Sequence, residues 1–187
     1  WRRCPCSNAD TLYTVEPTPI HVPGTIDQVQ LAALAQQPAR AKLDMLRWAL
    51  FQWVIGNADA HGKNFSFFVQ GDLLEPVPWY DLVSVEQYAG LDHAHAMAMG
   101  DAFTWDELTP FNLAYFAHQC GIGSALLKRE TARLARAMSS ARSVLDTYAY
   151  DDDEREFLLP ICAMAQTRSQ ALVERARAAG DFSEAHF

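Results

Sequence analysis

An apolar run gives way to a polar loop in Phe51-Gln52-Trp53-Val54-Ile55-Gly56-Asn57-Ala58-Asp59-Ala60-His61-Gly62-Lys63-Asn64. Upstream of the loop, apolar side chains recur at intervals of three and four residues, which is the spacing of one helix face. They are Leu43, Leu46, Leu50, Trp53 and Val54. Pro38 suits the first turn of a helix and Gly56 suits its end, so the pattern predicts a helix from Pro38 to about Gly56.

Downstream of the loop, two segments flank a turn-like Gln70-Gly71-Asp72. Residues 65–69 and 75–80 predict the arms of a short β-hairpin, because the glycine can adopt the positive φ of a tight turn. Pro76 and Pro78 have no N–H to donate to a sheet, so we expect the second arm to be an edge strand.

The rest of the chain is predicted to be irregular over residues 85–102 and helical beyond them. One helix opens at Thr109-Pro110 and stops before Gly121, and a longer one follows Ser124. Apolar residues recur along it at Leu126, Leu127, Leu134, Met138 and Leu145. Four acids, residues 151–154, complement the dipole of a last helix, which Pro160 restarts or kinks. The predicted fold class is mainly α with one hairpin.

Composition excludes several classes of protein. The formal charge is −8 and the 15 basic residues are scattered, so we expect no direct nucleic-acid partner. No apolar run approaches the ~20 residues of a membrane span, so we expect no membrane partner. The four cysteines are irregularly spaced and are interpreted as reduced thiols of a cytoplasmic protein. They are Cys4, Cys6, Cys120 and Cys162.

Three polar residues are candidates for phosphoryl-transfer chemistry. Asp59 and Asn64 lie in the loop, and the hairpin should return Asp81 to the same place. Mg²⁺ prefers oxygen ligands and keeps several waters, so Asn64 and Asp81 suffice as metal ligands. Asp59 would accept the proton of the substrate hydroxyl, and His61 or Lys63 would contact the γ-phosphate of ATP.

The same residues carry a resemblance to a known family. Residues 51–66, 80–84 and 98–100 together resemble the C-terminal lobe of HipA-like serine/threonine protein kinases, the toxins of bacterial toxin-antitoxin systems. The resemblance implies a mostly helical, protein-kinase-like C-terminal lobe, ATP and Mg²⁺ as cofactors, and a protein substrate. It also implies a HipB-like helix-turn-helix antitoxin as partner. By resemblance, Asp59 is the catalytic aspartate, and Asn64 and Asp81 are the magnesium ligands.

The chain departs from the complete kinase pattern. A kinase grips ATP with a glycine-rich loop and a strand lysine, but Gly24 is the only glycine before Gly56, and Lys42 belongs to the predicted helix. We therefore expect residues 38–187 to form the HipA-like C-terminal lobe and residues 1–37 an extended lead-in left from an upstream region. The N-terminal lobe is expected to be absent here and supplied in cis or in trans, and the chain alone to be inactive.

Other interpretations remain open. In one alternative, the chain retains the loop only by descent and is a non-catalytic interaction module. Such a module would bind a HipB-like DNA-binding partner or a separate N-terminal lobe. The string Asp59-x-His61-x-x-Asn64 also occurs in phosphoinositide-type kinases, which leaves a small-molecule or lipid kinase. His93 and His95 are interpreted as loop residues rather than zinc ligands. Trp48, Phe51, Trp53 and Phe67 are interpreted as core.

Overall fold

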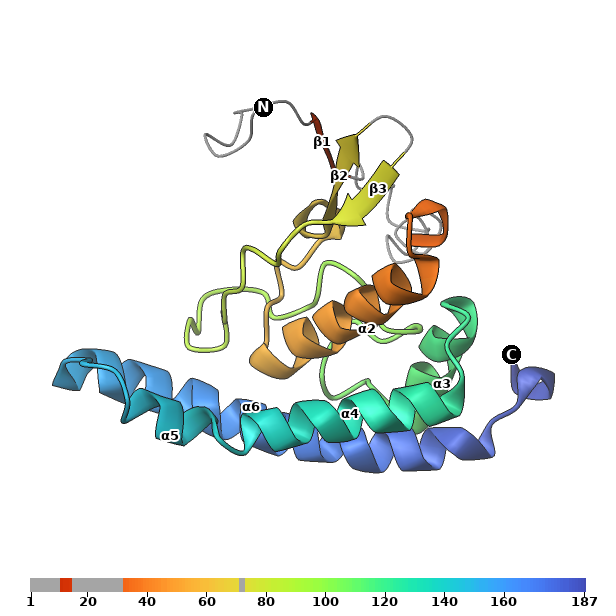
Figure 1. Cartoon of the computed structure of the whole chain (residues 1–187). Helices are drawn as coiled ribbons and strands as arrows, with labels where there is room; N and C mark the ends of the chain where they lie inside the picture. Colours follow the sequence, from red (N-terminus) through yellow and green to blue (C-terminus); the bar gives the residue numbers. More distant parts are fainter. Residues whose placement is uncertain (1–10, 15–31, 71–72) are drawn as a thin grey trace.

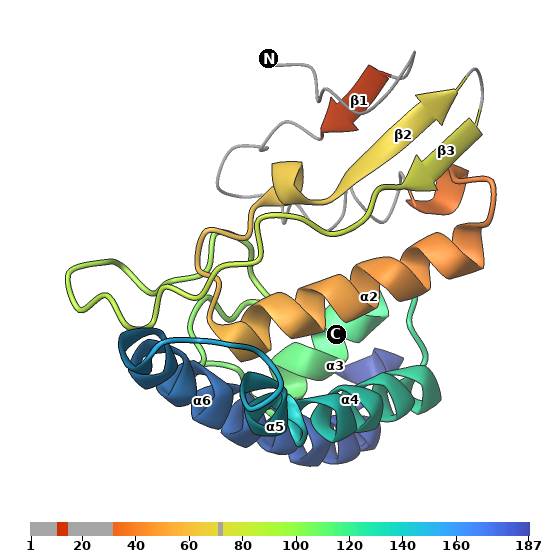
Figure 2. The same cartoon turned by 60° about the vertical axis from the view of Figure 1, so that its left-hand side comes forward.

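The computed structural model describes residues 11–14, 32–70 and 73–187 (Figure 1). A small sheet lies on one side of a central helix, and long helices lie on the other side (Figures 1 and 2). The strands are β1 (Thr11–Thr14), β2 (Ser66–Gln70) and β3 (Leu73–Pro76). The α-helices are α2 (Pro38–Ile55), α3 (Pro110–Gln119), α4 (Ser124–Met138), α5 (Ala141–Leu145) and α6 (Asp152–Ala178). Single 3₁₀ turns are η1 (Gly62–Asn64), η2 (Ala179–Asp181) and η3 (Glu184–His186).

The sheet has three antiparallel strands in the order β1-β2-β3. The predicted hairpin is confirmed, and its second arm is an edge strand as expected. The prediction of residues 75–80 for that arm is wrong in its bounds, because β3 runs from Leu73 to Pro76. Beyond it, the Val77 N–H still donates to the Ser66 carbonyl (3.0 Å). Strand β1 was not predicted. It lies within the predicted lead-in, of which residues 1–10 and 15–31 are outside the described part.

Helix α2 begins and ends where the sequence predicts. Pro38 occupies its first turn, where a missing N–H costs nothing, and Gly56 closes it at φ 68° and ψ 42°. Its C-terminal half is buried on nearly all sides, since it lies between the sheet and the helical layer. Trp48, Trp53 and Phe67 are buried, which confirms that they belong to the core, whereas Phe51 is half-buried.

The helical layer departs from the prediction at two points. The helix after Ser124 ends at Met138, and Leu145 belongs to the separate helix α5. The Ser139 hydroxyl donates to the Arg136 carbonyl (2.7 Å), which competes with continued helix hydrogen bonding. Helix α6 runs unbroken through Pro160, so Pro160 does not restart it.

Side-chain contacts cap the helices and join the layers. Thr109 with Asn112 and Asp151 with Glu154 form capping boxes at the starts of α3 and α6. Arg47 of α2 donates to the buried carboxylate of Glu130 on α4 (2.8 Å). None of the helices in the described ranges is both long enough and apolar enough to cross a membrane.

Candidate active site

The polar loop between α2 and η1 is held by backbone contacts to a distant part of the chain. Gly56 adopts a left-handed conformation, and its carbonyl accepts from the Val85 amide (3.2 Å). Two residues later, the Ala58 carbonyl accepts from the Ala96 amide (2.8 Å). The irregular segment after β3 therefore packs along the loop, and this arrangement brings Asp81 to it.

Asn64 and Asp81 meet across the hairpin. The Asn64 amide nitrogen donates to the Asp81 carboxylate over 2.6 Å, although the residues are 17 positions apart. Asn64 is buried, whereas Asp81 is exposed. The expectation that the hairpin returns Asp81 to the loop is thus confirmed, and the Asp81 side chain lies at the surface above the buried Asn64.

The backbone of Asp81 is held in an uncommon conformation. Its φ is 56°, and it is the only residue other than glycine with positive φ among those described. This conformation costs about 1–2 kcal/mol for an L-residue, and Asp tolerates it better than most. The fully buried Asn57 side chain donates to the Asp81 carbonyl (2.8 Å) and to Gln52 Oε1 (2.9 Å). The buried network therefore offsets the cost and sets where the carboxylate emerges.

A second set of contacts ties the loop to the segment that carries Asp81. The Tyr80 hydroxyl donates to the Lys63 carbonyl. The Ser66 hydroxyl lies 2.6 Å from the Tyr80 hydroxyl and 3.2 Å from the same carbonyl. The residues that directly precede Asn64 and Asp81 are therefore joined to each other, which supports the contact between the pair.

The other three predicted site residues lie in the same loop, and the His61 carbonyl accepts from the Asn64 backbone N–H (2.9 Å). Among the described residues, their side chains form no hydrogen bond or ion pair with the Asn64 or Asp81 side chain. Asp59 is exposed and makes no hydrogen bond or ion pair with any described residue. His61 and Lys63 are half-buried, and the Nδ1 atom of His61 has no partner within the described ranges. The structure thus brings Asn64 and Asp81 together and leaves the Asp59 carboxylate open to solvent.

The Asn64 and Asp81 side chains fit a magnesium ion. Each side chain carries a hard oxygen atom, the Asn64 amide group touches the Asp81 carboxylate through its nitrogen, and Asp81 is accessible to further ligands. Mg²⁺ commonly uses one or two carboxylates and keeps several waters. A cluster of three or more His, Cys, Asp or Glu side chains suited to a metal does not occur in the described part of the chain.

Four supporting residues were missed by sequence reasoning, namely Gln52, Asn57, Ser66 and Tyr80. The sequence does mark Gln52 and Asn57. Gln52 is a polar residue within an apolar run, four residues after Trp48, and Asn57 directly follows the glycine that ends the helix. The hydroxyl pair had no such signal, since its two members meet only after the hairpin forms.

The two histidines of residues 92–95 have different surroundings. His95 stacks on Trp53 with ring centroids 4.1 Å apart and planes at 5°. Burial lowers the pKa of His95 to about 4, with a further lowering by the nearby Arg168 cation. His93 lies on the surface side, with its Nδ1 atom 3.5 Å from the carboxylate of Glu86, which also pairs with Arg168 (2.7 Å).

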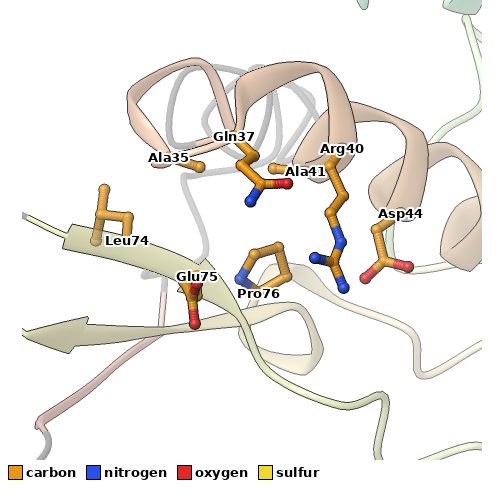
Figure 3. Close-up of a pocket in the computed structure, with 8 residues that line it drawn as sticks. All are labelled: Ala35, Gln37, Arg40, Ala41, Asp44, Leu74, Glu75 and Pro76. Atoms are coloured by element: carbon orange, nitrogen blue, oxygen red, sulfur yellow. The ribbon is translucent and has the colours of Figure 1, made fainter.

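A pocket of about 140 Å³ lies between the start of α2 and β3 (Figure 3). Gln37, Arg40 and Asp44 line it from the helical side, and Glu75 and Pro76 line it from the strand. None of the predicted site residues lines this pocket. It is therefore separate from the Asn64 and Asp81 pair.

Comparison with curated proteins identifies relatives. The serine/threonine-protein kinase toxin HipA of Shewanella oneidensis is 43% identical over 130 residues, which are 68% of this chain and 30% of that protein. The Y4mE protein of Sinorhizobium fredii is 36% identical over 119 residues, which are 63% of this chain and 28% of that protein. The chain thus spans about three tenths of the length of these relatives.

A solved structure shares the fold. The complex of Shewanella oneidensis HipA with HipB and its operator DNA matches with a TM-score of 0.73 and 34% identity, over 85% of this chain and 38% of that chain. This confirms the predicted fold class, a mainly α, kinase-like C-terminal lobe. A family model described as the HipA-like C-terminal domain matches residues 2–145. The chain therefore belongs to the family of HipA-like C-terminal domains.

Proposed function

We propose that this chain carries the catalytic and metal-binding groups of a HipA-like protein kinase that transfers the γ-phosphoryl group of ATP to a serine or threonine hydroxyl. The contact between Asn64 and Asp81 carries the proposal. It joins two oxygen-bearing side chains across the hairpin at a backbone position that the buried Asn57 holds. Backbone held in a sparsely populated conformation clusters at active sites and ligand-binding sites, which supports a functional role for Asp81.

Each loop residue has a role in this proposal. Asn64 and Asp81 would hold Mg²⁺, which supplies charge neutralisation at the phosphates. The exposed Asp59 carboxylate is free to accept the proton of a substrate hydroxyl. Lys63 and His61 flank the pair, where a cation or a donor can stabilise the charge that develops on the transferred group. Phosphoryl transfer depends mainly on such positioning and electrostatics.

The complete reaction needs more than the described residues. The curated relatives are more than three times as long as the segments they share with this chain, and ATP in a kinase is gripped between two lobes. An N-terminal lobe, in cis or in trans, would supply the groups that cover the phosphates. A protein substrate and a HipB-like antitoxin are the partners that follow from the relationship to HipA, whose solved structure contains HipB.

Titration calorimetry with Mg²⁺-ATP tests this proposal. The chain should bind weakly or not at all by itself, and should bind in the longer protein or when mixed with an N-terminal lobe. Asp81→Asn should abolish binding of the metal complex in that mixture. Asp92→Asn is the control, because Asp92 is an exposed aspartate that accepts from the Ala94 amide and from no other residue in the described ranges. Equal binding by both variants would contradict the metal role of Asp81.

A non-catalytic interaction module is the second candidate, and one surface favours it. Leu82, Val83, Tyr88, Leu91 and Phe157 are exposed around an apolar groove of about 630 Å³ directly after Asp81. Exposed apolar patches commonly mark protein interfaces. If Mg²⁺-ATP binds neither to the chain nor to its mixture with an N-terminal lobe, while the lobe itself associates, this second function replaces the first.

A further inference from the structure

Three buried polar atoms belong to residues that line one small cavity beneath the loop. They are Trp48 Nε1, Gln52 Nε2 and His95 Nδ1, and none has a hydrogen-bond partner among the described residues. The residues are 2%, 1% and 4% exposed, respectively. All three line a cavity of about 20 Å³ that Trp53 and Met99 also border. Buried polar groups in folded proteins are rarely left unpaired, so each of these atoms needs a partner, and one molecule in the cavity can serve all three.

The chemistry of the three atoms specifies that partner. The indole and amide nitrogens are donors only. The His95 ring is neutral at pH 7, because burial lowers its pKa to about 4, so Nδ1 can accept when the ring proton is on Nε2. A partner that accepts two hydrogen bonds, from the indole and the amide, and donates one, to Nδ1, satisfies all three atoms.

The cavity admits only a very small molecule of this kind. A buried water needs roughly 10–15 Å³ of accessible volume and two to four polar partners, and this cavity meets both conditions. A metal ion does not fit, since two of the three groups are N–H donors. A larger alcohol or anion exceeds the available space.

We propose that this cavity binds a single water molecule, and that the water is the inner end of a polar chain that runs through Gln52 and Asn57 to the Asp81 backbone. The water would hold the Gln52 amide in place. Gln52 Oε1 in turn accepts from Asn57 Nδ2, and Asn57 Nδ2 also donates to the Asp81 carbonyl. The role of Asp81 as a metal ligand rests on the proposed function. The water site and the polar chain do not depend on that function.

NMR on the 187-residue chain tests the water directly. A cross-peak between the Trp48 indole proton and a long-lived water is expected, together with a His95 ring that carries its proton on Nε2. A Trp48 indole proton without any water contact would overturn the proposal. So would a His95 ring that is protonated on Nδ1, because it could not accept from the water.

The polar chain is tested by Gln52→Met, which keeps an unbranched side chain and removes the amide. The water cross-peak should disappear, and exchange of the Val85 amide, which is bonded to Gly56 at the same turn, should rise roughly tenfold. The control is Gln170→Met, at an exposed position of α6. Trp48→Phe, which removes one donor and keeps an aromatic ring, serves if Gln52→Met fails to fold.

These readouts do not involve a metal or ATP. If the water is present and Asp81 binds no Mg²⁺, the proposed function fails and the water site stands. If Gln52→Met leaves amide exchange around Asp81 at the level of the Gln170→Met control, the link between the water and Asp81 is wrong.

Discussion

Replacing Gly56 by alanine should destabilise the turn on which the candidate site depends. At φ 68° a side chain costs about 1–2 kcal/mol. A Cβ atom would lie 2.3 Å from Glu86 Cγ and 2.8 Å from Arg168 Nη1. It would therefore displace their ion pair (2.7 Å), whose side chains are 21% and 13% exposed, and this loss adds about 1–3 kcal/mol. The expected total is about 2–5 kcal/mol.

Urea and thermal unfolding measure this loss, which corresponds to a fall in melting temperature on the order of 10 °C for a chain of this size. Gly121→Ala is the matched control, because Gly121 also has positive φ (62°) but meets only Lys42 Nζ at 3.6 Å. It should lose about 1–2 kcal/mol. Gly90→Ala should change little, because a Cβ there meets no atom of the described residues within 4 Å. If the free energy of unfolding falls equally in Gly56→Ala and Gly121→Ala, the clash with the Glu86–Arg168 ion pair does not contribute to the loss of stability.

Three further predictions concern other parts of the molecule. Gly100→Ala should cost about 3–5 kcal/mol in urea unfolding, because its Cβ would lie 2.4 Å from the Asn112 backbone oxygen at φ 63°, and backbone cannot yield as a side chain does. Burial alone would raise the pKa of Glu130, but hydrogen bonds, first from Arg47, lower it below its ordinary value of 4.5. As the pH falls, Glu130 is therefore protonated at a higher pH in the unfolded chain than in the folded chain. Glu130→Gln should therefore cost about 1–3 kcal/mol at pH 7, and the difference from the unmodified chain should shrink as the pH falls below 4.5. Burial raises the pKa of the Cys120 thiol to about 12, so its alkylation at pH 8, followed by peptide mass spectrometry, should be about a thousandfold slower in the folded chain than in urea.

The parts of the fold that depend on neighbouring residues could be predicted from the sequence. Helix α2 lies between a proline that suits its first turn and a glycine that ends it, and both signals act within a few residues. The meeting of Asn64 and Asp81 was also predictable, since a hairpin with a turn at residues 70–72 must return the chain to its start. In both cases local geometry decides the outcome.

Features that depend on distant segments could not be predicted. Strand β1 has four residues and pairs with a strand more than fifty positions away, so no local periodicity identifies it. The support of Asp81 by Asn57 depends on a buried amide that reaches a carbonyl 24 positions away. A buried polar side chain has no spacing rule, and its partner is defined only when the layers pack.

Phosphotransfer by the longer protein, or by this chain reconstituted with an N-terminal lobe, tests the central claim most directly. Transfer of labelled phosphate from ATP should require Mg²⁺. It should fall by about 10²–10⁴-fold in Asp59→Asn and by at least about 10²-fold in Asp81→Asn. Asp92→Asn, at an exposed position outside the loop, should retain full transfer. Undiminished transfer by both Asp59→Asn and Asp81→Asn would contradict the assignment of this loop and hairpin as the phosphoryl-transfer site.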